Sequence, residues 1–455
     1  MEQEFYHALK IKQDLCIGCT HCMKVCPTEA IRVQQGKAVL FENRCVDCGE
    51  CFRACPVCAI IIEQDDFDKI FDFPVRVALV PAVFIGQFPE EIPTEEIYSE
   101  LMEIGFTHVF EVEHGVEILE NELNKYISDH PDTKPAISPY CPAIVRLIQV
   151  KFPALVENFI LLKQPVDAAA IYNRKKFLDA GFKPEEIGLF YISPCAAKIA
   201  AVKCPVGEKV SEVTGVINMN VVFNKVYTHI KQGKKETCVV PFRKSLKAKS
   251  IVWSLTRGES VNTSGRSLAI DGIHNVIEFL EKLENDERLD IDFLEFRACD
   301  EGCAGGVLTT GNRFLTVERL HKRAGRARTR EMNTVPNQES ILDYKEYVIE
   351  RLRLDKIKPR SMMKLDDDML EAMRKMKKVH ELMLFLPLVD CGTCGSPSCS
   401  SLAEDIVQGR ATISKCIFVQ QALEERKVFS FEEAFNSLKS TWGKDKFNKK
   451  WQVNF

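Results

Sequence analysis

The sequence predicts a multidomain α/β protein, and two observations lead to that prediction. Short apolar runs at 75–80, 134–138, 187–193 and 291–298 are interspersed with helix-period stretches at 98–106, 116–127 and 220–231. This order is typical of a largely parallel sheet. Residues 1–60 also repeat a cysteine pattern 29 residues later. We therefore expect a cysteine-rich domain at 1–70, a central α/β domain at 71–315, a basic connector at 316–360, a small α-rich cysteine domain at 361–425 and a tail at 426–455.

Composition excludes several function classes. The net charge of −4 gives no sign of nucleic-acid binding. No apolar stretch approaches the ~20 residues that a membrane span requires, and the first residues show no secretory signal. Nineteen cysteines in 455 residues are the exception. Their short spacing, without a signal, favours metal ligation in a reducing compartment, so we expect a soluble cytoplasmic protein.

The repeat in the first domain has the form C-x2-C-x2-C-x3-C-P. Its members are Cys16, Cys19, Cys22 and Cys26, then Cys45, Cys48, Cys51 and Cys55. In two-cluster ferredoxins three cysteines of such a run bind one cubane and the fourth binds the other. The predicted partition is Cys16, Cys19, Cys22 and Cys55 on one [4Fe–4S] cluster, and Cys26, Cys45, Cys48 and Cys51 on the second. A zinc ribbon would need four ligands rather than eight, and Cys58 is expected to be a buried thiol.

Four further cysteines follow the predicted strands of the central domain. They are Cys141, Cys195, Cys299 and Cys303. Ligand sites in open α/β sheets lie beyond the carboxyl ends of the strands, so we expect these cysteines to converge at one sheet edge. Four thiolates suffice for one cubane.

The segments around these cysteines carry a family resemblance. SPYCPAIV, SPCAAK and RACDEGCAGG resemble the three signature motifs of the [FeFe]-hydrogenase catalytic domain, and the likeness extends over roughly residues 1–315. It implies a ferredoxin-like α+β module followed by a hydrogenase-like α/β domain. It also implies a cubane on the four cysteines, joined through Cys303 to a two-iron subcluster with CO, CN and a bridging dithiolate. Pro81, Ala82 and Lys198 would then shape the pocket or donate hydrogen bonds to the diatomic ligands.

The sequence departs from the family pattern near that site. Tyr140 stands where the catalytic enzymes place a cysteine that shuttles protons, and a phenol is a poorer relay than a thiol at neutral pH. Ser193 and Arg297 stand where methionines are expected. Carboxylates of the stretch 112–123 are available for a proton path, but their register is open. Asp300 and Glu301 are either substitutes in that path or exposed acids.

A last cysteine group has the form C-x2-C-x4-C-x16-C. It comprises Cys391, Cys394, Cys399 and Cys416 and resembles the single-cubane domain of Rnf-type redox complexes and corrinoid proteins. A zinc site is the alternative. Cys58, Cys204 and Cys238 then remain without a role.

Three other segments allow two interpretations each. The basic stretch 315–360 is either a solvated connector or a docking surface. A methionine stripe at 369–383 indicates a core face rather than a cofactor site. The tail after 425 is either an amphipathic helix or a loosely held end.

These features support three hypotheses about function. The first is an enzyme that interconverts H2 with protons and electrons, at a low rate because of Tyr140. The second is a hydrogen or redox sensor whose C-terminal cluster domain passes the signal to another protein. The third is an electron-transfer protein or scaffold without the two-iron unit. Expected partners are H2 and protons, and a ferredoxin or another redox or signalling protein; the oligomeric state stays open.

Overall fold

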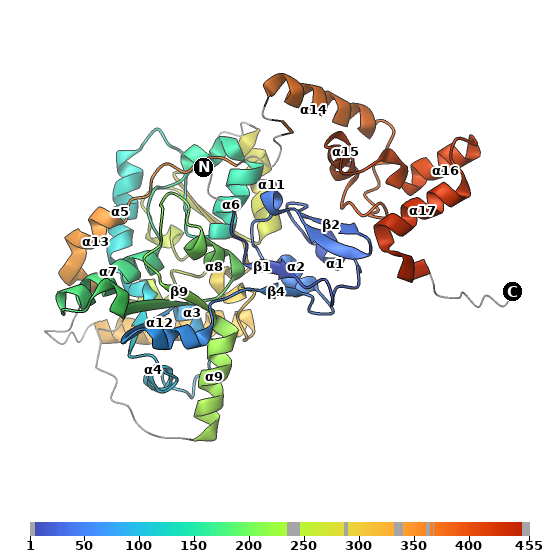
Figure 1. Ribbon diagram of the computed structural model, residues 1–455. Coiled ribbons are helices and arrows are strands. Elements are labelled where there is room, and N and C mark those ends of the chain that lie inside the picture. Colours follow the sequence, from blue (N-terminus) through green and yellow to red (C-terminus); the bar gives the residue numbers. More distant parts are fainter. Residues whose placement is uncertain are drawn as a thin grey trace. The chain divides into compact units, whose positions relative to one another are not determined.

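The computed structural model describes residues 5–233, 246–285, 290–331, 340–360, 365–366 and 368–447 (Figure 1). The chain divides into two compact units, and each is described by itself. The first unit is formed by residues 1–8 and 63–359, and the second by residues 9–62 and 360–455. The C-terminal cysteine domain thus belongs with the N-terminal one.

A four-stranded parallel sheet forms one half of the first unit. Its strand order is β6 (His108–Glu111), β5 (Val75–Val80), β8 (Ile187–Ser193) and β9 (Gly215–Asn218). β8 is buried along its whole length, as expected for a strand that is covered on both faces. These strands confirm the predicted α/β architecture.

A second parallel sheet contains the remaining strands. It has the order β10 (Ser267–Asp271), β11 (Phe293–Arg297) and β7 (Ala136–Ile137). The prediction of one common sheet edge is therefore wrong, because β7 pairs with β11 and not with β8. The strands that precede the central cysteines belong to two sheets.

Helices connect and cover these strands. The longer ones in the first unit are α4 (Thr94–Glu103), α5 (Val116–Asp129), α6 (Pro142–Lys151), α7 (Pro165–Asp179), α8 (Ala196–Lys203), α9 (Met219–Gln232), α11 (Ile273–Glu284), α12 (Arg313–Glu331) and α13 (Lys345–Arg351); α3 (Ala82–Ile85) and α10 (Ala248–Ile251) are short. α6 and α7 both begin with proline, which is favoured at the first helical position. No described helix is both long and apolar enough for a bilayer crossing.

In the stretch 315–360, which was expected to be a solvated connector or a docking surface, the described residues up to 331 belong to the helix α12. α12 packs on α3 and α10, and Leu320 is completely buried. Arg323 forms a two-pronged ion pair with the buried Glu111, at 2.6 and 2.7 Å. α12 therefore folds as part of the first unit, because the narrow apolar stripe on this basic helix packs against α3 and α10.

The second unit begins with two antiparallel strand pairs and two short helices. β1 (Leu9–Ile11) pairs with β4 (Ile60–Ile62), and β2 (Ile31–Gln34) pairs with β3 (Lys37–Leu40); the helices are α1 (His21–Lys24) and α2 (Glu50–Ala54). This part has the predicted ferredoxin-like α+β character. The C-terminal part is helical, with α14 (Met369–Met383), α15 (Cys399–Val407), α16 (Ile417–Glu425) and α17 (Phe431–Trp442).

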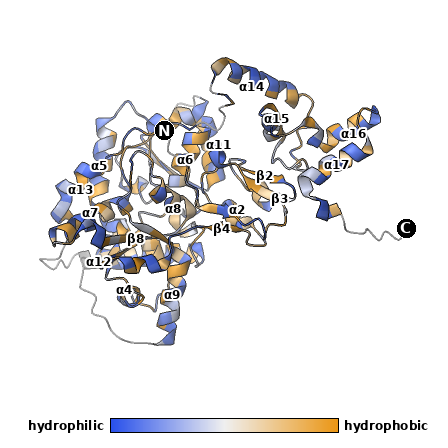
Figure 2. Cartoon of the chain, in the orientation of Figure 1, coloured by the Kyte–Doolittle hydropathy of each residue, from blue (hydrophilic) through white to orange (hydrophobic). Residues whose placement is uncertain are grey.

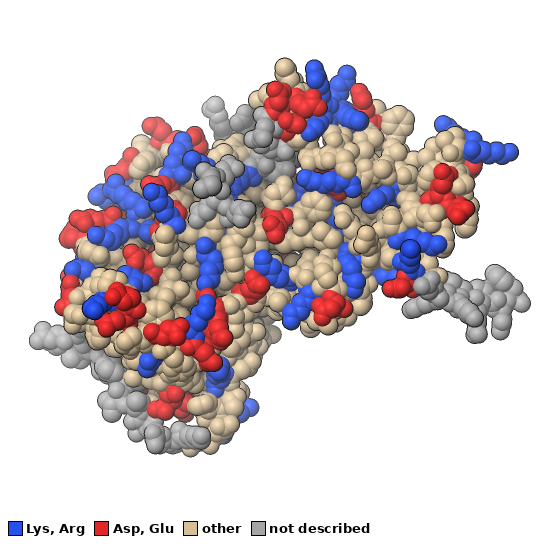
Figure 3. Space-filling view, viewed as in Figure 1, with Lys and Arg blue, Asp and Glu red and all other residues tan. Residues whose placement is uncertain are grey.

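The packing of the C-terminal helices tests the expectations for the tail and for the methionine stripe. α17 is a helix that contacts β2, so residues Phe431–Trp442 of the tail are held rather than loose. The core interpretation of the methionine stripe is wrong for its first two turns, because Met369 and Met373 are 75% and 63% exposed. Val379 and Met383 of the same helix do pack into a small core around Leu402. Figure 2 shows apolar and polar residues mixed along α14, and Figure 3 shows both charge signs on its surface.

Candidate metal centres

The eight N-terminal cysteines gather in two groups of four. Cys16, Cys19, Cys22 and Cys55 line one common cavity together with Val33 and Ile60. Burial raises the pKa of Cys22 to about 12, and the other three cysteines of its group add to the shift. Cys45, Cys48 and Cys51 have Cys26 as a common electrostatic neighbour. The structure thus brings together the two sets that the partition predicts as ligands.

Backbone geometry around these groups suits thiolate ligands. The amides of Ala30, Ala38 and Ala59 donate to the sulfurs of Cys26, Cys16 and Cys55 at 3.2, 3.3 and 3.2 Å. Such N–H···S bonds stabilise negative charge on sulfur. Gly18 has a φ of +61°, and a Cβ there would lie 2.2 Å from a backbone oxygen, so only glycine fits this turn.

The central cysteines converge from three chain segments. Cys141 and Cys195 are the residues immediately before α6 and α8, and Cys303 lies in the one-turn helix Gly302–Gly305. Burial raises the pKa of Cys195 to about 12, with the Lys198 charge opposing the shift and Cys303 and Cys141 adding to it. Cys299 precedes the same turn, with its Cβ 3.5 Å from the position that a Cβ on Gly305 would take. A metal centre would displace the thiol protons and offset this burial, so the donor set fits a cubane.

Tyr140 lies beside Cys303 in this site. Its side chain is buried, and its hydroxyl is 3.8 Å from Cys303 Sγ. Lys198 Nζ lies 4.3 Å from the ring centre and Arg297 Cζ lies 4.2 Å from it. Burial raises the pKa of Tyr140 well above its ordinary value, and Cys303 adds to the shift. The phenol therefore stays protonated at neutral pH and is held between two cations.

Arg297 is fixed by two buried carboxylates. Its guanidinium is 2.8 Å from Glu259 and 3.2 Å from Glu295. Ser138 donates to Glu259 at 2.8 Å, and the backbone amides of Glu259 and Ser260 donate to Glu295. All three charged side chains are almost completely buried. The residue in the methionine position is thus a rigidly held cation rather than an apolar wall.

The other residues assigned by resemblance already have protein partners. Lys198 Nζ donates to Gln164 Oε1 at 2.8 Å, and the Ala82 amide donates to Glu113 at 2.8 Å. Ser193 donates to the Cys195 carbonyl at 2.9 Å and so stabilises that turn. Pro81 precedes α3 and is buried.

A two-iron unit fits these surroundings poorly. By the resemblance, Cys303 would hold such a unit and Lys198 would donate to its ligands, and the Tyr140 side chain contacts both residues. The donors that would hold its ligands, Lys198 and the Ala82 amide, already bond to Gln164 and Glu113. The cubane therefore fits as the residues stand, and the two-iron unit does not.

Glu113 is a site residue that the sequence did not single out. It lies in the turn Val112–Gly115, and its second carboxylate oxygen is buried without a hydrogen-bond partner. Burial raises its pKa to about 8, and Glu111 adds to the shift. Its charge also contributes to the raised pKa of Tyr140 and Tyr191. No local feature distinguishes it from the other glutamates of the stretch 112–123.

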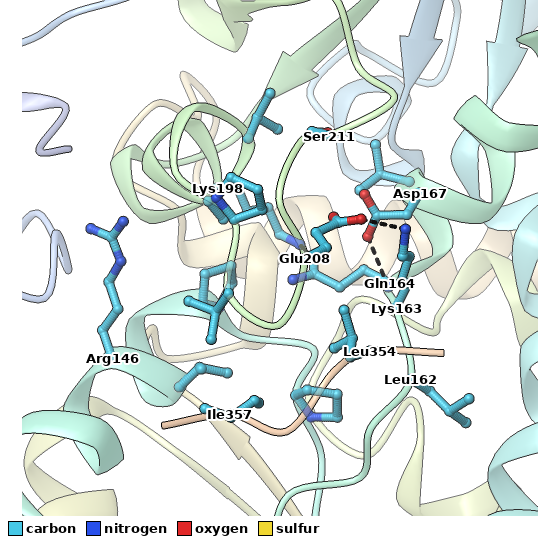
Figure 4. Close-up of a pocket in the computed structure, with 18 of the residues that line it drawn as sticks. Arg146, Leu162, Lys163, Gln164, Asp167, Lys198, Glu208, Ser211, Leu354 and Ile357 are labelled. Atoms are coloured by element: carbon cyan, nitrogen blue, oxygen red, sulfur yellow. Dashed lines mark hydrogen bonds and ion pairs between the residues drawn. The ribbon is translucent and has the colours of Figure 1, made fainter. Parts of the chain in front are cut away.

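A cavity adjoins the site on the side of Lys198 (Figure 4). On its polar side, Lys163 pairs with Glu208. Asp167 lies on the same side and accepts a hydrogen bond from the backbone amide of Gln164 at 3.0 Å. Its other walls are mostly apolar, with Leu354 and Ile357 among them. Burial raises the pKa of Asp167 and of Glu208. The cavity thus brings titratable groups close to Lys198 without any cysteine in its lining.

The C-terminal cysteines also form one group. Cys399 and Cys416 belong to a small buried core against which Cys394 packs. Burial raises the pKa of Cys394, and Cys391 and Cys416 add to the shift. The Cys399 amide donates to Asp390 at 2.6 Å, which fixes the loop before α15.

Three cysteines and the acid Asp300 do not belong to the groups of expected cluster ligands. Cys58 is exposed, so the expectation of a buried thiol is wrong; Cys204 is buried, and Cys238 lies outside the described residues. Asp300 is about half exposed and pairs with Arg313 at 3.1 Å. Its position agrees with the interpretation as an exposed acid.

Three segments of the chain match known protein families. Residues 74–252 match the family "Iron only hydrogenase large subunit, C-terminal domain". Residues 8–56 match the "4Fe-4S dicluster domain" family, and residues 386–418 match the family "Putative Fe-S cluster". The last match favours iron over zinc at the C-terminal cysteines.

Individual relatives are distant. The periplasmic [Fe] hydrogenase large subunit of Nitratidesulfovibrio vulgaris is 27% identical over 221 residues, which are 42% of this chain and 50% of that protein. The chain thus spans about half the length of this curated relative. Solved structures of [FeFe]-hydrogenase HydA1 from Chlamydomonas reinhardtii include one that is 14% identical, with a TM-score of 0.42 over 64% of this chain and 96% of that one, and an apo variant with 13% and 0.41. Residues 74–252 are thus similar to the C-terminal domain of the iron-only hydrogenase large subunit, and the segments 8–56 and 386–418 on either side are similar to iron–sulfur cluster domains.

Proposed function

We propose that this protein is a redox relay with a sensory or regulatory role, in which electrons pass among [4Fe–4S] clusters and the central site holds a cubane. In this proposal two clusters lie on the N-terminal cysteines, one on the C-terminal cysteines and one on Cys141, Cys195, Cys299 and Cys303. The signal would pass to a ferredoxin or another redox or signalling protein in a reducing compartment such as the cytoplasm.

The position of Tyr140 is the observation that carries this proposal. Its side chain contacts Cys303 and Lys198, the residues that the resemblance assigns to holding a two-iron unit and to donating to its ligands. Rotation of the ring out of this position would give up its contacts with Lys198 and Arg297, and cation–π contacts in a desolvated site are each worth up to about 2 kcal/mol. Arg297 cannot follow readily, because Glu259 and Glu295 hold it. These contacts therefore hold the Tyr140 ring against Cys303 and Lys198.

A second candidate is slow interconversion of H2 with protons and electrons. The observation in its favour is a buried acid beside the site: Glu113 has a pKa raised to about 8 and bonds to the Ala82 amide. A carboxyl group with such a pKa can give and take protons at neutral pH. Tyr140 at the relay position would keep this activity low, because a phenol with a raised pKa is a poor proton acceptor.

Infrared spectroscopy with iron quantification separates the two candidates. The full chain, produced together with the factors that build the two-iron unit, is expected to contain about 16 iron atoms and to show no CO or CN bands. Intense CO and CN bands, with about 18 iron atoms, would reject the first candidate in favour of the second. A zinc-containing protein with little iron would reject both.

A further inference from the structure

The C-terminal cysteine domain is joined to the N-terminal one by backbone hydrogen bonds. The Val33 amide of β2 donates to the Gly395 carbonyl at 2.8 Å, and the amides of Gln35 and Gly36 donate to carbonyls at the end of α17 at 3.0 and 2.9 Å. The β2–β3 hairpin thus uses its free edge to bind the C-terminal segment. An edge paired in this way is a fixed contact within the fold.

A buried ion pair strengthens the same interface. Arg32 of β2 lies 2.6 Å from Asp405 of α15, and both side chains are more than nine-tenths buried. Arg44 pairs with Glu404, and Ser401 donates to Glu29. Buried charges are costly unless they are paired with good geometry, so this arrangement indicates a permanent interface.

The contacts run directly between two cysteine groups. Val33 lines the cavity of the group Cys16, Cys19, Cys22 and Cys55, and its partner Gly395 follows Cys394. Gly392, in the same loop, has a φ of +74°, and a Cβ there would lie 3.0 Å from Met23. Met23 follows Cys22 and is buried. The two ligand loops are therefore separated by a hydrogen bond and by one buried side chain.

We propose that the C-terminal cluster exchanges electrons directly with the cluster on Cys16, Cys19, Cys22 and Cys55, as a third stage of one relay. In each step one electron moves, so that one cluster is oxidised and the other is reduced, with no bond broken. The proposal rests on the iron–sulfur part of the proposed function and is independent of any hydrogen chemistry. It gives the C-terminal domain a role inside the chain as well as toward a partner.

Electron paramagnetic resonance of the fully reduced full-length protein tests this. We expect the signal of the N-terminal cluster to be broadened and split by the neighbouring reduced C-terminal cluster. Cys416→Ala should lose about four iron atoms together with the part of the splitting that the C-terminal cluster causes, while the signals of the two N-terminal clusters and their mutual coupling persist. Identical line shapes in the two proteins, with the iron loss observed, would overturn the proposal. The infrared result concerns only the central site. A failure of the proposed function can therefore be distinguished from a failure of the electron-exchange proposal.

A pair of arginine variants tests the interface itself. Arg32→Ala is expected to weaken the splitting at full iron content, because it leaves Asp405 buried without its partner. Arg53→Ala is the control: Arg53 pairs with Glu50 on the surface of the same module, at 3.6 Å. If Arg32→Ala loses iron, Arg44→Gln at the edge of the interface replaces it. Undiminished splitting in an interface variant with full iron content would show that these contacts do not position the clusters.

Discussion

At the residue scale, the site differs from the hydrogenase motifs that it resembles through a few side chains, and the effect of these side chains depends on their neighbours. Tyr140 and Arg297 could be named from the sequence as departures. Their consequence could not, because it arises from contacts with Lys198, Glu259 and Glu295, which are distant in sequence or unremarkable in it.

Replacement of Tyr140 tests whether the ring excludes the two-iron unit. Tyr140→Cys removes the ring and supplies a thiol, so we expect CO and CN bands and hydrogen turnover at least tenfold above that of the wild type. Infrared spectra and hydrogen evolution from a reduced dye measure both effects.

Tyr140→Phe is the matched control, since it keeps the ring and removes only the hydroxyl. It should show neither bands nor turnover. CO and CN bands in the phenylalanine variant would show that the ring does not exclude the two-iron unit.

Glu113 predicts a dependence of stability on pH. Its folded pKa of about 8 lies above the ordinary value of 4.5, so the cost of ionising it in the folded protein is absent below about pH 4.5. The cost grows as pH rises from 4.5 to 8 and is constant above that. Glu113→Gln should therefore raise the melting temperature at pH 8 but hardly at pH 5, as thermal denaturation can measure. Glu157→Gln, in an exposed ion pair with Lys356, should have little effect at either pH.

At the scale of elements, periodicity predicted the strands well and the basic helix α12 badly. The strands at 75–80 and 187–193 are mostly apolar runs, as expected for buried strands. α12 is predominantly charged, and its buried stripe consists of Leu320, Ala324 and Ala327. Those residues recur at helical spacing, but so narrow a stripe is also found on solvated helices.

The ion pair of α12 should be essential to its docking. Arg323→Ala leaves Glu111 buried and unpaired, and we expect a loss of about 3–5 kcal/mol in the free energy of unfolding. Chemical denaturation monitored by circular dichroism measures this. Arg326→Ala removes an exposed neighbour 3.6 Å from Glu90 and should cost under about 1 kcal/mol. Equal losses in the two variants would show that burial of the pair is not what matters.

At the scale of the whole molecule, the two units depend differently on their metal. Elements between residues 9 and 62 contain at most five residues, too few to bury a sizeable core. The first unit has two sheets and extensive helical cover. Metal–ligand bonds must then supply much of the stability of the second unit.

Iron removal should therefore unfold the second unit first. After anaerobic chelation, limited proteolysis is expected to cut within 9–62 and 368–447 while a fragment spanning about 63–359 persists. Mass spectrometry of the fragments reads out the order. Simultaneous digestion of both units would show that the first also depends on its cluster.

The sequence by itself determined the cysteine groups, because C-x2-C spacing places thiolates together through local backbone geometry. It also determined the strands that precede the central cysteines and the departures at Tyr140 and Arg297. Only the tertiary structure decided that these strands form two sheets, that Glu113 faces the Ala82 amide, and that the C-terminal cysteines join the N-terminal ones. These features depend on which distant segments pack together, and the energy of a buried charge or a filled space is defined only once its surroundings are in place.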